Sequence, residues 1–229
     1  MQSLTSCQSR TYASGPMNYI AERRQEEKER RRSEILDAAE AVCSEVGWDA
    51  MTMDQVARKA RLSRALLYVY FKDKTDLLFG ICERALFTLT QRFGEAVGRH
   101  KRGLDQLQAI GRAYVAFSQE FPVYFEVVAR CELLTPEPTT DSNEAAAMTM
   151  GDSCRSLMVD VVKAGIADGS IRADVGEPNV VSNVLWGFMH GVLQITATKA
   201  SALLHAGMTT KEFVEHALLM ATRSVEAKS

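Results

Sequence analysis

The stretch LSRALLYVYFKDK, Leu62 to Lys74, decides the fold of the N-terminal part of the chain. Ser63 is a residue type that caps helix N-termini, and the apolar and aromatic residues behind it predict a short helix. Upstream, Thr52 can cap a helix through its hydroxyl, and Gln55 can return the hydrogen bond as a capping box. We expect that earlier helix to end near Ala60. Two helices joined by three or four residues form a helix-turn-helix unit.

The outward side of the second helix, which we expect to run to about Tyr70, carries residue types that contact DNA. Such a helix fits the major groove with its N-terminal residues facing base edges, where Arg64 could donate two hydrogen bonds to a guanine. Tyrosine hydroxyls and Lys74, at the start of a further helix, would contact phosphates. The candidate DNA-contacting residues are Thr52, Ser63, Arg64, Leu66, Tyr68, Tyr70, Lys72 and Lys74.

Charge supports DNA contact locally but not over the whole chain. Residues 51–74 contain six Lys or Arg and two Asp, a local balance of +4. The chain as a whole has a formal net charge of −2, so the argument rests on the local patch. On the patch alone, a solvated charged face on an ordinary pair of helices is an equally good explanation.

A longer segment contains this patch, Ile35 to Leu78, with the sequence ILDAAEAVCSEVGWDAMTMDQVARKARLSRALLYVYFKDKTDLL. It closely resembles the DNA-binding domain of the TetR (tetracycline repressor) family of bacterial transcription regulators. The resemblance implies DNA contacts for Thr52, Ser63, Arg64, Tyr68, Tyr70 and Lys74, and a left-handed stop of the first helix at Gly47. Its diagnostic pieces are Ala38-Ala39, Gly47, Thr52, Val56-Ala57, Ser63, Leu67-Tyr68, Tyr70-Phe71, Lys72, Lys74 and Leu77-Leu78.

Two positions depart from the family pattern. Arg61 stands in the turn where the family usually has Gly, so we expect a slightly strained turn or one of different shape. Leu66 stands where a DNA-facing Thr is common, and because Leu cannot donate a hydrogen bond we expect it to pack on a thymine methyl or to reach no base. These departures bear on the operator sequence rather than on DNA binding itself.

Composition indicates an ordinary soluble globular protein of 229 residues, 46% hydrophobic and 24% charged. We expect no membrane span, because the most apolar stretch, residues 180–195, is interrupted by polar residues and is better explained as a buried helix. The first residues lack the apolar core of a signal peptide. The five cysteines are odd in number and widely spaced, which disfavours a disulfide framework and zinc. A reducing cytoplasm fits best, with no metal or cofactor.

The predicted fold is all-α, with an N-terminal three-helix helix-turn-helix domain and a C-terminal helical ligand-binding and dimerisation domain. We expect a disordered tail over residues 1–18, the DNA-binding domain over 19–80 and the helical effector domain over 81–229. Asp141 with Glu144, and Thr209 with Glu212, have the spacing of helix starts. Breaks that delimit about six further helices are expected at residues 94–103, 120–122, 135–141, 165–178 and 204–209.

Residues 21–32, AERRQEEKERRR, mix charges of both signs. Glu26 with Arg30 and Glu27 with Arg31 have the i,i+4 spacing of helical ion pairs, which favours a solvated extension of the first helix. The alternative is a basic arm that reaches phosphates or a minor groove.

Dimerisation is implied, because two-fold pairing places two recognition helices one DNA turn, roughly 34–36 Å, apart. The helices predicted over residues 178–204 and 210–226 are the best candidates for the interface, and by resemblance they would form a four-helix bundle with the partner. The alternative is that their apolar faces are buried within one subunit. The candidate interface residues are Leu185, Phe188, Val192, Ile195, Phe213, Ala217 and Met220.

Aromatic and Met residues between the two domains could line an effector pocket, although such residues at helical spacing are more often plain core. His190 is best explained as a core histidine whose hydrogen bonds are satisfied. The candidate ligand-binding residues are Phe117, Phe121, Tyr124, Phe125, Met148, Met158, Trp186 and His190.

The sequence favours a ligand-responsive regulator that binds double-stranded DNA at a palindromic operator as a homodimer, with repression and release by a small molecule implied by family resemblance. An enzyme is disfavoured because the chain lacks a G-x-S-x-G elbow, a phosphate-binding glycine loop and an H-E-x-x-H motif, and its four His residues lie far apart in sequence. The alternative is a helical small-molecule-binding protein without specific DNA binding.

Overall fold

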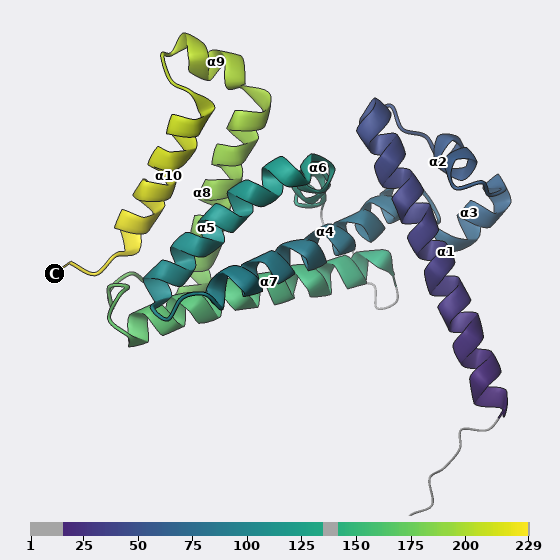
Figure 1. The fold of residues 1–229 in the computed structure, drawn as a ribbon, viewed down its shortest axis with the longest axis horizontal. Coiled ribbons are helices and arrows are strands. Elements are labelled where there is room, and N and C mark those ends of the chain that lie inside the picture. The colour runs from purple at the N-terminus through teal and green to yellow at the C-terminus, as the bar shows by residue number, and fades with distance from the viewer. Residues whose placement is uncertain (1–15, 135–141, 229) are drawn as a thin grey trace, which may run out of the picture. The chain divides into compact units, whose positions relative to one another are not determined.

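The computed structural model describes residues 16–134 and 142–228, and its regular secondary structure there is α-helical, with no strand among these residues (Figure 1). The all-α fold predicted from the sequence is confirmed. Two compact units divide the chain between Tyr70 and Phe71, whereas the sequence analysis placed the domain boundary at residue 80. The helix that begins at Lys74 is continuous through residue 80, so the second unit starts before it.

The first unit consists of α1 (Pro16–Val46), α2 (Met53–Lys59) and α3 (Arg64–Tyr70), with α2 packed on both other helices. Its apolar spacing gives a buried core that includes Ile35, Leu36 and Leu67. Gly47 ends α1 with φ 79, and its N–H donates to the Cys43 carbonyl, which confirms the expected left-handed stop.

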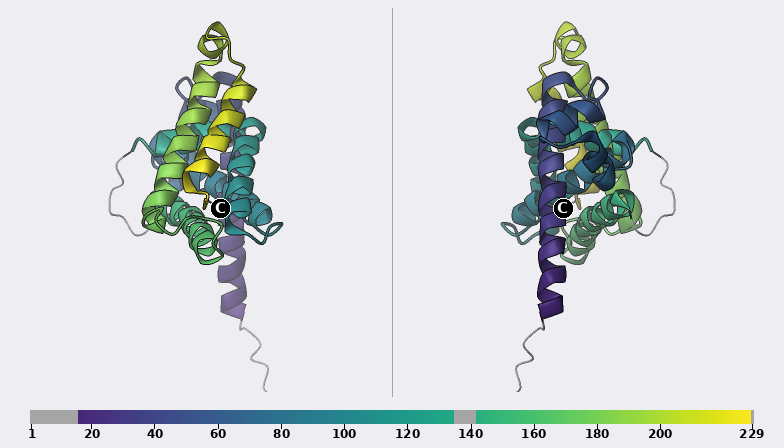
Figure 2. Two further views of the ribbon diagram at one scale, coloured as in Figure 1. Left: turned by 90° about the vertical axis from the view of Figure 1, so that its left-hand side faces the viewer. Right: turned by 90° about the vertical axis from the view of Figure 1, so that its right-hand side faces the viewer.

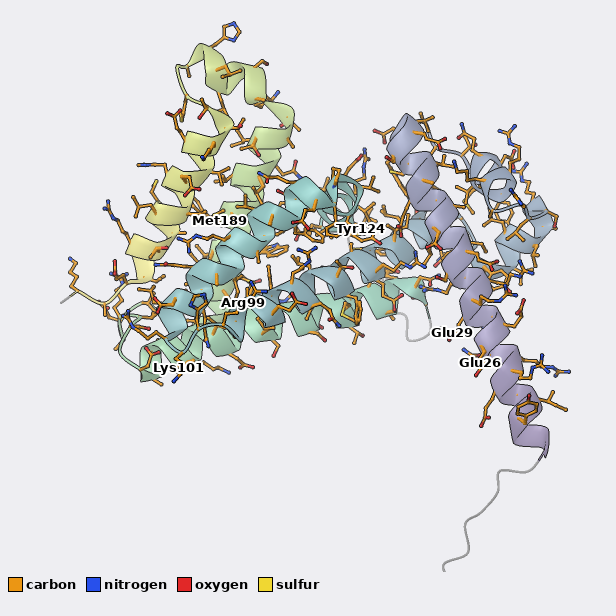
Figure 3. All side chains as sticks on the ribbon, viewed as in Figure 1. Glu26, Glu29, Arg99, Lys101, Tyr124 and Met189 are labelled. Atoms are coloured by element: carbon orange, nitrogen blue, oxygen red, sulfur yellow. The ribbon has the colours of Figure 1, made fainter. Side chains whose placement is uncertain are left out.

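The N-terminal half of α1 is a long charged helix. It begins at Pro16, so the last three residues of the predicted disordered tail are helical, while residues 1–15 lie outside the described residues. Arg31 pairs with Glu27 as predicted, but Arg30 pairs with Glu27 and Glu34 instead of Glu26. Figure 3 places the Glu26 and Glu29 side chains on this part of α1. These i,i+3 and i,i+4 pairs support the helical extension.

The second unit is built around α4 and α7, which lie side by side. The last two long helices, α8 and α10, run antiparallel and are joined through the short α9 (Figure 2). The helices are α4 (Lys74–Val97), α5 (Gly103–Glu120), α6 (Pro122–Cys131), α7 (Asn143–Ala167), α8 (Pro178–Thr198), α9 (Ala200–His205) and α10 (Thr210–Val225).

Two predicted helix boundaries are corrected. The helix expected over residues 178–204 is interrupted at Lys199, whose backbone at φ −127 and ψ 22 is not helical. The start of α7 is capped by Ser142, which accepts a hydrogen bond from the Ala145 N–H at 3.2 Å, whereas the predicted cap Asp141 lies outside the described residues. The capping box of Thr209 with Glu212 is present as predicted.

A glycine pair brings α5 and α7 into close contact. A Cβ atom on Gly103 would lie 2.2 Å from the Gly165 Cα, so the backbones meet where neither residue has a side chain. The loop after α7 then caps α5, because Asp168 accepts from the Gly103 N–H at 2.7 Å and Ser170 accepts from the Leu104 N–H at 3.0 Å. A hydrogen bond from the Ser170 hydroxyl, followed by those from the Gly103 and Ser170 N–H groups, lowers the pKa of Asp168.

Contrary to expectation, α8 does reach the length and apolar composition of a membrane-spanning helix, and 33% of its most apolar window is buried. Length and composition do not distinguish a span from a core helix. Here α8 packs on α7, α10 and α5, and the buried Ser182 and His190 are hydrogen-bonded within the unit. This is the pattern of a helix with one face in a protein core and an apolar second face.

Candidate nucleic-acid interface and effector cavity

The start of each helix in the helix-turn-helix is fixed by a side-chain cap. Thr52 Oγ1 accepts from the Gln55 N–H at 3.3 Å, and the Thr52 N–H donates to Gln55 Oε1 at 2.7 Å. Ser63 Oγ accepts from the Leu66 N–H at 3.2 Å, so α3 begins at Arg64. Both predicted caps are confirmed, and they set the register of the turn between α2 and α3.

The turn itself is a Schellman motif with Arg61 in the left-handed position. Arg61 has φ 57, and its N–H donates to the Arg58 carbonyl at 3.1 Å. The Leu62 N–H donates to the Ala57 carbonyl at 2.9 Å, which completes the second bond of the motif. Arg61 therefore preserves the turn geometry that Gly usually supplies, at a conformational cost of about 1–2 kcal/mol.

Arg64 is held in place on the outward side of α3. Its Nε lies 3.1 Å from Asp54 Oδ1, and its guanidinium lies over the Tyr68 ring at 5.6 Å from the centroid. The side chain is 65% exposed, so its remaining donors face solvent. A fork of donors oriented by two neighbours suits bidentate recognition of a base edge.

The other predicted contact residues form an exposed surface in the first unit. Leu66 and Tyr68 are exposed and Tyr70 is half-buried. Val69, which the sequence analysis overlooked, is 77% exposed. Its position between two outward tyrosines could have identified Val69 as a candidate contact residue, because methyl groups on a recognition helix can contact a thymine methyl.

Lys72 and Lys74 belong to the second unit, directly after α3 in sequence. Lys72 is exposed, and Lys74 is half-buried as the first residue of α4. The backbone around them is fixed by two carboxylates. Asp73 caps α4 by accepting from the Asp76 N–H at 2.7 Å, and Asp76 Oδ2 accepts from the Lys72 N–H at 3.0 Å.

Within the second unit, α4, α6, α7 and α8 line a cavity of about 320 Å³. Most of its wall is apolar or sulfur-bearing. Of the predicted ligand-binding residues, Met148, Met158 and Trp186 line it. Sequence reasoning missed the charged residues of the wall, for which the helical spacing gave no signal. They are Glu132, Glu144, Asp152 and Arg155.

The other five predicted pocket residues do not line this cavity. Phe117 and Phe125 are buried core residues, and Phe117, Phe121 and Tyr124 pack ring against ring at centroid distances of 5.6 to 6.4 Å. Figure 3 labels Tyr124, which belongs to α6. Helical spacing alone does not indicate which face of α5 or α6 is turned toward α7.

His190 lies behind the cavity wall. Its Nδ1 is hydrogen-bonded to the Tyr114 hydroxyl at 2.6 Å, and its Nε2 lies 3.3 Å from Gln194 Nε2 and 3.7 Å from Glu132 Oε2. Burial lowers the pKa of His190, and the Glu132 carboxylate offsets this only in part. The residue is a hydrogen-bonded core histidine, as expected. Glu132 Oε1 in turn accepts from Trp186 Nε1 at 2.6 Å.

Cysteine and carboxylate positions give no metal site within the described residues, where no group of three His, Cys, Asp or Glu side chains is placed to bind an ion. Among the same residues, Cys43, Cys82, Cys131 and Cys154 form no disulfide.

The apolar faces of α8 and α10 only partly match the predicted interface. Leu185, Val192 and Ala217 are buried within the subunit, so they are core rather than available for a partner, and Phe213 is half-buried. Phe188, Ile195 and Met220 are exposed, together with three residues that were not predicted. These are Val180, Val184 and Leu219.

Together, the two caps, the left-handed turn and the exposed Arg and Tyr side chains define the first unit as a helix-turn-helix DNA-binding domain. Residues 35–81 match the family model described as "Bacterial regulatory proteins, tetR family". The regulator HbdR of Aromatoleum sp. (strain CIB), an HTH-type transcriptional regulator, is 35% identical over 88 residues, which cover 38% of this chain and 38% of HbdR. Residues 35–81 therefore form a DNA-binding domain of the tetR family of bacterial regulatory proteins.

Solved structures extend the likeness of fold to the second unit. A bacterial regulatory protein in the tetR family from Rhodococcus RHA1 has a TM-score of 0.64 and 17% identity, over 87% of this chain and 98% of that chain. SmeT, the repressor of the Stenotrophomonas maltophilia multidrug efflux pump SmeDEF, has a TM-score of 0.61 and 20% identity, over 86% of this chain and 91% of SmeT. The alignment with HbdR, by contrast, covers well under two thirds of that relative.

Proposed function

We propose that this chain is a ligand-responsive transcriptional regulator that binds a palindromic DNA operator as a homodimer and represses until a small molecule releases it. The observation that carries the proposal is the Schellman turn at Arg61, which keeps the family's geometry between α2 and α3 and leaves Arg64 exposed. As a bacterial regulator of DNA it would act in the cytoplasm.

Base recognition falls to the N-terminal half of α3. Arg64 would donate to a guanine edge, a contact that discriminates by about 1–3 kcal/mol. Leu66, exposed beside it, would pack on a thymine methyl. The hydroxyls of Thr52, Ser63, Tyr68 and Tyr70 and the ammonium groups of Lys72 and Lys74 would contact phosphates and fix the register.

Dimerisation would use the apolar surface that α8 and α10 leave exposed. Val184, Phe188 and Ile195 recur along one side of α8, and Gly187 and Gly191 between them have no neighbouring atom within 4 Å of an added Cβ. Met220 on α10 is also exposed. Contiguous exposed apolar surface of this kind marks protein interfaces, and a two-fold pair would present two copies of α3 to DNA.

The cavity of the second unit is the proposed effector site. Its wall includes residues of α4 and α7, so a ligand that prefers one arrangement of these helices would shift α4 and change the spacing of the two recognition helices. The alternative of a ligand-binding protein without specific DNA binding is disfavoured, because Arg61 keeps the turn and Leu66 remains exposed. We propose no enzymatic activity.

A footprint on DNA beside the chain's own gene tests this proposal. We expect protection of two half-sites with centres roughly 34–36 Å apart, bound by two protein chains, in the presence of excess unrelated DNA. Equal binding to unrelated DNA of the same length, or protection of one half-site by one chain, would contradict it.

A further inference from the structure

We propose that the cavity lined by α4, α6, α7 and α8 binds a lipophilic organic monocation, an amine or a quaternary ammonium, and that Glu132 is its anchoring carboxylate. This inference rests on the proposed function only in taking the cavity as the effector site. The comparisons with known proteins leave the effector open.

The cavity has the size and surface of a site for a small, mostly apolar molecule. Its volume of about 320 Å³ lies at the small end of ligand pockets. Leu86, Val128 and Phe79 supply apolar wall, and Met148 and Met158 supply flexible, polarisable side chains that adapt to irregular shapes.

The charges on the wall are predominantly negative. Glu132, Glu144 and Asp152 supply three carboxylates against the one guanidinium of Arg155. Arg155 Nη2 is itself bonded to Asp152 Oδ1 at 2.6 Å, so these two charges compensate each other and the excess negative charge of the wall comes from Glu132 and Glu144. An anionic ligand would therefore meet like charge in a partly desolvated site, whereas a cation would be attracted.

Glu132 is the carboxylate best placed to attract that cation. Its two oxygens contact the neutral indole N–H of Trp186 at 2.6 Å and the imidazole of His190 at 3.7 Å. Burial keeps His190 uncharged at neutral pH by lowering its pKa. Within residues 16–134 and 142–228, no Lys or Arg forms an ion pair with Glu132. The Glu132 side chain is 42% exposed, so a bound cation would replace water beside the carboxylate and supply a counter-charge.

Trp186 adds an aromatic surface to this carboxylate. Its indole is fixed at two points, because its N–H donates to Glu132 and its ring stacks on the Tyr114 ring at a centroid distance of 4.7 Å. Indole is the strongest cation-binding ring among the side chains. A rigid indole next to a carboxylate, in an otherwise apolar wall, is the chemistry that recognises ammonium groups.

Three probes of matched shape test the charge preference on the full chain without DNA. Benzyltrimethylammonium carries the positive charge, neopentylbenzene replaces its nitrogen by carbon, and phenylmethanesulfonate carries a negative charge. At equal free concentration, we expect the cation to bind about ten-fold or more tightly than either other probe, measured by calorimetry and by the rise in melting temperature.

The Glu132→Gln variant separates charge from shape. Glutamine keeps an acceptor oxygen for the Trp186 N–H, so the fold and the binding of neopentylbenzene should persist while cation affinity falls by about ten-fold. Glu95→Gln, an exposed residue of α4 outside the cavity wall, removes the same charge and should leave cation affinity unchanged.

Absence of cation binding, equal or tighter binding of the neutral or anionic probe, or an unaltered cation affinity in Glu132→Gln would overturn the inference. If Glu132→Gln fails to fold, the relative affinities of the three probes for the unmodified chain still test whether the cavity prefers a cation. DNA binding is measured separately, so a chain that binds the cation but no operator refutes the proposed function alone. A chain that binds its operator but prefers the neutral probe refutes this inference alone.

Discussion

Asn143, the first residue of α7, donates a hydrogen bond from Nδ2 to Oδ1 of Asp76 on α4 at 2.9 Å. The other oxygen of the same carboxylate accepts from the backbone N–H of Lys72 at 3.0 Å. Asp76 is 8% exposed, so both bonds lie in a largely desolvated setting. Because the next residue of α7, Glu144, lines the cavity, one carboxylate connects the cavity wall to the segment that carries Lys72 and Lys74.

Removing the Asn143 amide should loosen that segment. We expect Asn143→Ala to increase amide hydrogen exchange of the peptide containing Lys72, because Asp76 loses one of the bonds that orient it. Mass spectrometry of deuterium uptake measures the effect, and Asn179→Ala on α8 is the matched control. Unchanged uptake at Lys72 would show that Asp76 holds its position without Asn143.

Replacing Gly103, at the contact of α5 with α7, and replacing Gly94, in open space on α4, should change the stability of the fold in opposite directions. Gly103→Ala places a Cβ 2.2 Å from the Gly165 backbone, so we expect a loss of about 1–3 kcal/mol in the free energy of unfolding. Gly94→Ala on α4, where no atom lies within 4 Å of the new Cβ, should instead stabilise by up to about 1 kcal/mol. Urea denaturation followed by circular dichroism compares them, and equal midpoints would refute the close approach.

The left-handed turn makes a second prediction about stability. Arg61→Gly removes the cost of a side chain at φ 57 and should raise the free energy of unfolding by about 1 kcal/mol. The control is Arg58→Gly, three residues earlier on the exposed side of α2, which should lower it by about 1 kcal/mol. Destabilisation of similar size by both changes would mean that the turn is not left-handed.

Two cysteines of the cavity wall, Cys131 and Cys154, should react slowly. Burial raises the pKa of Cys154 to about 11, and a hydrogen bond with Cys82 together with burial raises the pKa of Cys131 further. A raised thiol pKa leaves the protonated, unreactive form dominant below it, so at pH 8 we expect alkylation by iodoacetamide about two orders of magnitude slower than in unfolded protein. The rate should rise with pH toward 11. Equal rates in native and urea-unfolded chains, followed by mass spectrometry, would contradict the shifts.

Local sequence signals predicted the helix-turn-helix well because its geometry depends on neighbours in the chain. Thr52, Gln55 and Ser63 cap helices three residues away, and Gly47 ends one by its own conformation. Arg61 left two possibilities open, strain or a different shape. The backbone hydrogen bonds show that the turn keeps its usual shape, and the positive φ of Arg61 shows that this residue is strained.

Residues of the cavity were predicted less well because their roles depend on contacts between distant helices. The helical spacing of apolar residues did not show whether Phe117 faces the core or a cavity, and the structure buries it in the core. The sequence also gave no reason to place Glu132 beside Trp186, which lies 54 positions later in the chain. The same holds for α8, where Leu185 and Phe188 lie on one broad apolar stripe but only Phe188 is exposed.

DNA affinity of the double variant Tyr68→Ala/Lys74→Ala tests the central claim most directly, with Lys211→Ala, an exposed lysine of α10, as the control. Fluorescence anisotropy with the footprinted operator should show loss of specific binding, at least about a hundred-fold, in the double variant, and no change in the control, with the helical circular dichroism signal intact in both. Unchanged affinity of the double variant would contradict the assignment of this surface to DNA.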